Sequence, residues 1–260
     1  MIREFDGGRL GGYMRPPFTS QNCSLCWRNC QGPKYPSVWV NKLFYPVANP
    51  PSRVKICKAM LGEIERIEIA RLWERNLRQE EMNLPKSERH RSLEPASAEF
   101  LCSLAAGIGA KRILEIGGSS GLSTIALAAG ARQAEGMVTS IEIEPQRQAE
   151  ALARIAHLGL ADYVDFVLGD AESMLEDLGE FDLVFIDCEK DDYIRFFDML
   201  DVPAGGIVVA DNVISHSLMN YIEHVRSFPI LESITLPIGK GLEVTRFREP
   251  SRVLPHRYDP

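Results

Sequence analysis

Short apolar runs alternate with longer amphipathic stretches from residue 93 onward. The runs are rich in Val, Ile, Leu and Phe, are only a few residues long, and are bounded by Gly, Asp or Pro, which is typical of buried parallel strands. The stretches between them carry apolar residues at the spacing of an amphipathic helix. We predict strands at residues 112–115, 137–143, 164–168, 181–186 and 207–210.

The helical stretches carry their own start signals. Pro95 and Pro145 stand where the first turn of a helix accepts proline. We predict helices from Pro95, at 122–131, at 145–157, from Ala171, at 193–200 and at 218–225. The chain then reads as a hairpin of residues 231–237 and 242–247 around a Gly-Lys-Gly turn. This order predicts an α/β fold: a doubly wound, Rossmann-like, seven-stranded, mostly parallel sheet with an antiparallel C-terminal strand pair.

The chain before residue 93 has a different character. Residues 1–52 hold seven Pro, five Gly and three Cys with little periodicity, so we expect an irregular leader there. Residues 53–92 are expected to form a helical extension followed by a charged linker. The main domain is expected at 93–250, with a tail at 251–260.

The cysteines of the leader allow two interpretations. Cys23, Cys26 and Cys30, with Cys57 as a distant fourth, could hold zinc or an iron–sulfur cluster and so staple a segment that lacks a core. The alternative is free thiols in a flexible leader, which the lack of a clear fourth ligand favours. Cys102 falls on a predicted helix and is expected in the core.

Composition narrows the function classes. The 260 residues are 45% hydrophobic and 25% charged, which is ordinary for a globular protein. The net charge of −7 argues against a broad basic surface for nucleic acid, although a small RNA bound through a local patch stays open. No apolar run approaches the roughly 18–20 residues that span a bilayer, and the N-terminus shows no export signal. We therefore expect reduced cysteines and a cytoplasmic location.

Polar side chains follow the fourth and fifth predicted strands. Asp187 ends the fourth strand, and Asp211 and Asn212 end the fifth. The carboxyl ends of parallel strands meet at one edge of the sheet, where open α/β folds bind ligands. These oxygen donors favour a hard divalent cation, and Lys190 would lie beside it as a proton acceptor. Each side chain alone is more often a helix cap, so the prediction depends on their joint placement.

A glycine-containing turn links the first predicted strand to a helix. Gly117 and Gly121 would let the backbone approach a ligand closely, and the amides at the start of the helix favour an anionic group. The spacing differs from the dinucleotide-binding pattern, and a tight turn without a ligand is the alternative.

Two further strand ends support a nucleoside. Glu142 follows the second strand, 21 residues beyond Gly121, where a carboxylate can accept both hydroxyls of a ribose; the alternative is a solvated glutamate. Gly169, Asp170 and Ala171 follow the third strand and could contact an adenine or cap a short helix. The turn and Glu142 together predict a cofactor that contains a nucleoside.

Five segments, in this order and with compatible spacing, resemble the cation-dependent O-methyltransferases, a family that includes catechol and caffeoyl-CoA O-methyltransferases. They are residues 112–129, 141–145, 181–193, 208–213 and 236–244. The resemblance covers about residues 90–248 and makes 93–250 a methyltransferase domain. Cys188 and Glu189 stand where the animal catechol enzymes have His and Trp.

The resemblance implies a cofactor, a metal and a base. Bordering S-adenosylmethionine we expect Glu115, Gly117, Ser119, Gly121, Ser123, Glu142, Gly169, Ala171 and Asp187. Binding Mg²⁺ or a similar ion we expect Asp187, Asp211 and Asn212, with Lys190 as the general base. The implied reaction is methyl transfer to a hydroxyl of a catechol-like or vicinal-diol small molecule. The resemblance also implies a homodimer.

Two other functions fit the same residues. The fold could methylate a modified RNA base or a natural-product scaffold, because substrates vary within the family. It could also be a module that binds S-adenosylmethionine without turnover, although the intact metal set and Lys190 argue against this.

Overall fold

Seven strands form one sheet in the computed structural model, which describes residues 61–85 and 88–254. The strands are β1 Arg112–Ile116, β2 Met137–Glu142, β3 Val164–Leu168, β4 Leu183–Ile186, β5 Ile207–Ala210, β6 Leu231–Leu236 and β7 Leu242–Phe247. All seven fall where the apolar runs predict them, and none of their ends differs by more than two residues. The predicted α/β class is confirmed.

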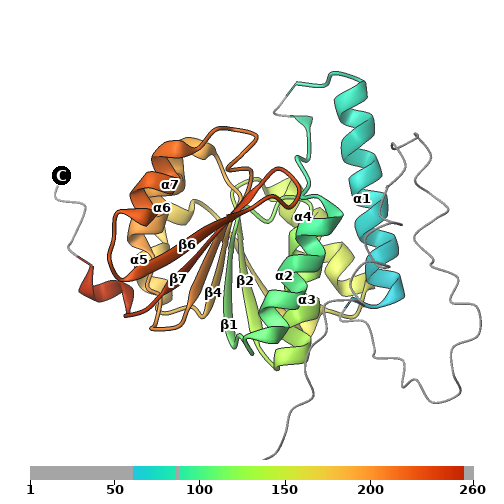
Figure 1. Ribbon diagram of the computed structural model, residues 1–260. Helices are drawn as coiled ribbons and strands as arrows, with labels where there is room; N and C mark the ends of the chain where they lie inside the picture. Colours follow the sequence, from blue (N-terminus) through green and yellow to red (C-terminus); the bar gives the residue numbers. More distant parts are fainter. Residues whose placement is uncertain (1–60, 86–87, 255–260) are drawn as a thin grey trace, which may run out of the picture. The chain divides into compact units, whose positions relative to one another are not determined.

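The order of the strands is β3-β2-β1-β4-β5-β7-β6 (Figure 1). Strands β1 to β5 pair in parallel, whereas β7 runs antiparallel to both β5 and β6. The sequence predicts the antiparallel pair at one edge. The structure adds that the last strand of the chain inserts between β5 and β6, so that β6 becomes the edge strand.

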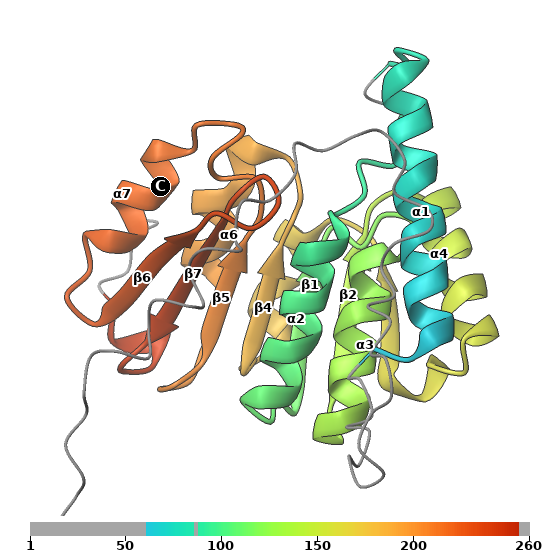
Figure 2. The same cartoon turned by 45° about the vertical axis from the view of Figure 1, so that its right-hand side comes forward.

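Helices cover both faces of the sheet (Figure 2). They are α1 Glu63–Glu81, α2 Pro95–Gly107, α3 Leu122–Ala134, α4 Pro145–His157, α5 Leu175–Leu178, α6 Tyr193–Met199 and α7 Met219–Arg226. Short 3-10 turns are η2 Ala161–Tyr163, η3 Ala171–Ser173, η4 Lys190–Asp192 and η5 Ser251–Val253. Neighbouring residues of a strand point to opposite faces, so Ile113 packs with α2 and α3 while Leu114 packs with α6 and α7.

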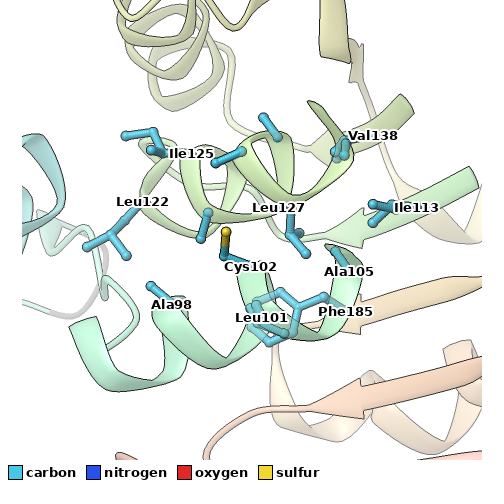
Figure 3. Close-up of a cluster of buried hydrophobic side chains, with 14 of the residues drawn as sticks. Ala98, Leu101, Cys102, Ala105, Ile113, Leu122, Ile125, Leu127, Val138 and Phe185 are labelled. Atoms are coloured by element: carbon cyan, nitrogen blue, oxygen red, sulfur yellow. The ribbon is translucent and has the colours of Figure 1, made fainter. Parts of the chain in front are cut away.

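The core between the sheet and helices α2 and α3 is closely packed. Cys102 lies on α2 facing α3, near Leu101 and Leu127 (Figure 3). It is 1% exposed, as predicted, and burial raises the pKa of its thiol to about 11. A Cβ atom on Gly130 of α3 would collide with Ala105 and with the carbonyl of Cys102, so glycine permits this close approach of the two helices.

Helix α1 belongs to the same compact unit as the sheet, residues 57–260. It lies beside α3 and α4 (Figures 1 and 2), buries Ile69 and Leu72, and pairs Glu65 with Arg132 of α3 at 2.8 Å. The helix lies within the predicted helical extension and linker, residues 53–92, of which residues 53–60 lie outside the described residues.

The predicted leader and its cysteines Cys23, Cys26, Cys30 and Cys57 also lie outside the described residues. In the predicted tail, Ser251 accepts a hydrogen bond from the Val202 amide at 2.9 Å, so at least its first residues contact the domain. Among the described helices, none has the length and apolar character needed to cross a membrane.

Candidate active site

A cavity of about 820 Å³ opens at the carboxyl edge of the sheet. Its walls come from the segments that follow β1 to β5 and from the segment that precedes α2. Of the residues predicted to border a cofactor, those that line it are Gly117, Ser119, Glu142, Gly169, Ala171 and Asp187. Three of the four side chains predicted to bind or act beside a metal, those of Asp187, Lys190 and Asn212, line the same cavity.

The turn after β1 approaches the end of β4 so closely that only glycine fits at residue 117. Gly117 has φ +94°, and a Cβ atom there would collide with the carbonyl oxygen of Asp187. The Gly117 amide donates to the carbonyl of Ile141 at 2.9 Å, which ties the turn to β2 as well. The turn is therefore held over the point where β1 lies between its two neighbours.

Glu142 lines the cavity at the end of β2. Its Oε2 atom accepts the Ser119 amide at 2.7 Å, and its Oε1 atom accepts the Glu144 amide at 2.9 Å. Each carboxylate oxygen keeps a further lone pair, so both can also accept a ligand hydroxyl. The side chain is held in one orientation at the end of β2, as a ribose-binding carboxylate requires.

Two carboxylates and one amide meet where β4 and β5 end. The Nδ2 atom of Asn212 donates to Oδ1 of Asp187 at 3.2 Å and to Oδ2 of Asp211 at 2.6 Å. Asn212 has φ +63°, in the left-handed region that Asn tolerates. The predicted convergence of these three side chains is what the structure shows.

This set fits a hard divalent cation. Asp211 is 1% exposed, and its Oδ1 atom has no hydrogen-bond partner. Burial, and then the charge of Asp187, raise the pKa of Asp211 well above its usual range. A cation between the carboxylates would offset both effects, and a half-turn of the Asn212 amide would present its oxygen as a third ligand.

The fit of this site to a divalent cation depends on the side-chain amide of Asn212. Among the described residues, no group of three or more His, Cys, Asp and Glu side chains could hold a metal ion. The two carboxylates alone would leave a hard cation with few protein ligands, so Asn212 completes the set.

Lys190 stands beside the carboxylates on the turn η4. Its Nζ atom lies 3.0 Å from Oδ1 of Asp187 and 2.6 Å from the hydroxyl of Tyr193. That hydroxyl in turn donates to the carbonyl of Asp211 at 3.2 Å. Tyr193 is fully buried, so it fixes the position of the ammonium group at the cavity wall.

Three predicted cofactor residues do not line the cavity. These are Glu115, Gly121 and Ser123. Glu115 points to the face covered by α3, where it accepts Thr124 Oγ1 at 2.6 Å and Ser140 Oγ at 2.5 Å. Burial raises the pKa of this carboxyl, and hydrogen bonds from Ser123, Ser140 and Thr124 oppose that rise. Its place in the structure is beneath the turn rather than in the cavity.

One wall of the cavity was not expected from the sequence. Residues 89–92, which were predicted to belong to a charged linker, line the cavity. There Arg91 pairs with Glu189 at 2.6 Å, and Ser119 Oγ donates to the carbonyl of His90 at 2.7 Å. The sequence carries one signal for this wall, the several Arg and His residues before Ser92. A charged run of this kind is usually a solvated face, so it does not by itself indicate a binding site.

Lys240, in the turn between β6 and β7, also lines the cavity. Its Nζ atom lies 3.8 Å from Oε1 of Glu94, which precedes α2. In the sequence, this turn closes the predicted hairpin and lies in one of the five family-like segments, but nothing local indicates that Lys240 reaches the cavity.

Known proteins match this chain over the same region. The family model described as O-methyltransferase matches residues 69–238. A catechol O-methyltransferase of Mycobacterium tuberculosis is 42% identical over 120 residues, which cover 45% of this chain and 54% of that protein. The chain thus spans about half the length of this relative. Caffeoyl-CoA O-methyltransferase 1 of Eucalyptus globulus is 30% identical over 176 residues, 57% of this chain and 71% of that enzyme.

Solved structures agree with the fold. The cofactor-bound Rv0187 from MTB gives a TM-score of 0.60 at 28% identity and covers 74% of this chain and 94% of that one. A putative O-methyltransferase from Klebsiella pneumoniae gives 0.57 at 26% identity, over 69% of this chain and 89% of that one. The family model spans more than half of the chain, and strands β1 to β6, the turn after β1 and the strand-end carboxylates lie within the matched residues. The chain therefore belongs to the O-methyltransferase family, in the group that includes the catechol and caffeoyl-CoA enzymes.

Proposed function

We propose that this protein is an S-adenosylmethionine-dependent, divalent-metal-dependent O-methyltransferase that acts on a catechol-like or vicinal-diol small molecule. The observation that carries the proposal is the meeting of Asp187, Asp211, Asn212 and Lys190 at one end of the cavity. The turn at Gly117 lies against Asp187, and the Glu142 carboxylate lines the same cavity, in the part that we call its cofactor end. A methyl donor and an acceptor can therefore share one cavity.

The cofactor end would hold S-adenosylmethionine, which supplies an electrophilic sulfonium methyl group. Glu142 would accept the ribose hydroxyls, because its two oxygens are already oriented by the amides of Ser119 and Glu144. Gly169 and Ala171 also line the cavity and would border the adenine. These residues bind and orient the donor, so that its methyl group faces the acceptor end.

The acceptor end would bind and deprotonate a hydroxyl. A divalent cation, most simply Mg²⁺, held by Asp187, Asp211 and Asn212 would stabilise the developing negative charge as a Lewis acid. In its neutral amine form, Lys190 would take the hydroxyl proton at its Nζ atom, which Asp187 and Tyr193 hold at the cavity wall. The walls formed by Arg91 and Glu189 would limit access of water.

The test is release of S-adenosylhomocysteine from S-adenosylmethionine with a panel of catechols, caffeoyl esters and flavonoids. It is run with Mg²⁺ and with EDTA. We expect turnover that EDTA abolishes and added Mg²⁺ restores. Turnover that EDTA does not affect would refute the metal mechanism, and absence of turnover with every diol would refute the acceptor class. Labelled methyl groups appearing in bulk tRNA would instead identify a nucleic-acid acceptor.

We also propose that the protein is a homodimer, on the strength of the family resemblance. Light scattering coupled to size-exclusion chromatography tests this directly. A mass near twice the 29.1 kDa of one chain is expected, and a monomer at micromolar concentration would contradict it.

A further inference from the structure

Three side chains of α1 form hydrogen bonds with two segments of the cavity wall. Arg75 contacts the turn after β1, while Asn76 and Gln79 contact the backbone of residues 90–92, which we call the wall segment. Arg75, Asn76 and Gln79 themselves do not line the cavity. Their effect on a bound molecule would therefore be exerted through the segments that they hold.

Arg75 fixes the turn at Ser120. Its Nη2 atom donates to Ser120 Oγ at 2.7 Å, and its Nη1 atom donates to Oε2 of Glu150 at 2.9 Å. Arg154 donates to the backbone carbonyl of Ser120 at 2.7 Å and to the same Glu150 oxygen at 2.9 Å. Two guanidinium groups thus donate hydrogen bonds to one buried serine, and both also pair with Glu150, which orients them.

The position of Ser120 determines that of its neighbour. Ser119 has φ +45°, a left-handed conformation that a non-glycine residue adopts only when its surroundings impose it. In that conformation its amide points at Glu142 Oε2, 2.7 Å away. The contact of Arg75 with Ser120 therefore supports the amide that orients the proposed ribose-binding carboxylate.

The wall segment is tied to the same helix. The His90 amide donates to Oε1 of Gln79 at 3.0 Å, and the Ser92 amide donates to Oδ1 of Asn76 at 3.0 Å. Asn76 is 1% exposed, so its bond to Ser92 is shielded from water. These two hydrogen bonds fix the position of the wall segment at the edge of the cavity.

One hydrogen bond closes the arrangement. Ser119 Oγ donates to the carbonyl of His90 at 2.7 Å, so the turn, the wall segment and α1 are each bonded to the other two. A closed ring of this kind keeps its members in one relative position, because moving one segment breaks bonds to both others.

We propose that Arg75, Asn76 and Gln79 are positioning residues that set the affinity for S-adenosylmethionine by holding the turn and the wall segment in the binding geometry. The inference rests on the proposed function only in the identity of the ligand. A preformed site spends less of its binding free energy on ordering, so loosening the ring weakens binding of the donor. None of the three side chains reaches Lys190 or the strand-end carboxylates, so the chemical step at saturating donor keeps its rate.

The test compares Arg75→Ala, Arg75→Lys and Gln79→Ala with the wild type in calorimetric titrations with S-adenosylhomocysteine. Loss of a charge-assisted hydrogen bond is expected to weaken binding about tenfold in Arg75→Ala, with less loss in Arg75→Lys. Where turnover is measured, KM for S-adenosylmethionine rises by a similar factor while kcat stays within about twofold. The matched control is Arg78→Ala, on the same helix, whose exposed side chain pairs with Glu74.

Ser120→Ala tests the same contact from the other side and removes no charge. It is expected to weaken binding too, and the double variant Arg75→Ala/Ser120→Ala should lose less than the sum of the two single losses. Hydrogen exchange of the amides of residues 117–121 in the ligand-free protein should be faster in Arg75→Ala than in Arg78→Ala.

The outcomes separate the two proposals. If the wild type binds S-adenosylhomocysteine and both Arg75→Ala and Ser120→Ala bind it equally well, the positioning role is refuted and the proposed function stands. A fall in kcat with unchanged KM would also refute it. If the wild type itself does not bind S-adenosylhomocysteine, the proposed function fails, and the positioning role fails with it.

Discussion

The Nζ atom of Lys190 lies 3.0 Å from Oδ1 of Asp187, three residues earlier in the chain. The pair joins the proposed base to the proposed metal site, because Asp187 also accepts the amide of Asn212. Lys190 is thus placed where a hydroxyl held by the strand-end donors would present its proton. Its position follows from η4, the single turn that leads from β4 into α6.

Replacing Lys190 is the sharpest test of the base. Lys190→Ala is expected to lower kcat by about 10²–10⁴-fold, the usual contribution of a general base. Lys190→Arg keeps the positive charge beside Asp187 but cannot release its proton near neutral pH, so it should be almost as inactive. Initial rates at saturating donor measure the effect, and calorimetry should show S-adenosylhomocysteine binding within about threefold of the wild type. An active Lys190→Arg protein would show that Lys190 supplies charge rather than base catalysis.

A divalent cation is expected to stabilise the protein through Asp211. Burial and the Asp187 carboxylate raise the pKa of Asp211, so its ionised form costs stability in the metal-free protein. A cation at about 100 times its Kd should contribute about 2.7 kcal/mol, which raises Tm by about 5–10 °C for a domain of this size. Differential scanning fluorimetry of EDTA-treated protein with added Mg²⁺ measures the shift.

Asp211→Asn gives the matched control for this measurement. It removes the buried charge, so the metal-free variant should melt at or above the Tm of the metal-free wild type. It should also lose the gain on adding Mg²⁺. A variant that still gains stability from Mg²⁺ would place the cation elsewhere.

Gly117 is expected to be irreplaceable for a steric reason. Gly117→Ala puts a methyl group against the carbonyl oxygen of Asp187 and strains a residue at φ +94°. We expect a loss of unfolding free energy of about 2–3 kcal/mol together with loss of S-adenosylhomocysteine binding. Urea denaturation and calorimetry measure the two effects.

Gly159→Ala separates backbone strain from the collision. Gly159 has φ +66°, but a Cβ atom there meets no heavy atom within 4 Å. It should cost about 1 kcal/mol and leave binding unchanged. Equal effects of the two substitutions would show that the close approach of the turn to β4 does not matter.

Glu150 is expected to make stability depend on pH in the acid range. Burial opposes ionisation, but the hydrogen bonds from Arg75 and Arg154 prevail and hold the pKa of Glu150 at about 2. A lowered pKa contributes stability above the unfolded value of 4.5, and that contribution is lost as pH falls toward about 2. The stability difference between wild type and Glu150→Gln should therefore shrink between pH 5 and pH 3 in urea titrations.

The expected size of the Glu150 effect is modest, below about 1 kcal/mol, because solvent reaches part of the side chain. Glu74→Gln is the control: it removes the same charge from an exposed pair with Arg78. A difference that does not change with pH would refute the role assigned to Glu150.

The elements of the fold could be read from the sequence because their signals are local. Helix α4 begins at Pro145 and ends at His157, and β3 covers 164–168, both as predicted. A proline fixes a first turn, and a run of apolar residues reports burial, through interactions between near neighbours in the chain. The same reasoning predicted that Asp187 and Asp211 lie at one edge of the sheet. Each follows a parallel strand, and the carboxyl ends of parallel strands lie at the same edge.

The tertiary structure decided what depends on distant partners. Sequence alone could not show that β7 inserts between β5 and β6, because the choice of neighbour depends on which sheet edge buries the hairpin. Nor could it show that residues 89–92 wall the cavity, since their polarity is the same in a solvated loop. Tertiary packing directs the Glu115 side chain toward α3 rather than into the cavity. It also brings Arg75 Nη2 to 2.7 Å from Ser120 Oγ, 45 residues away in the chain. Such contacts form only when burial of the whole domain fixes two segments at once, and no local pattern encodes them.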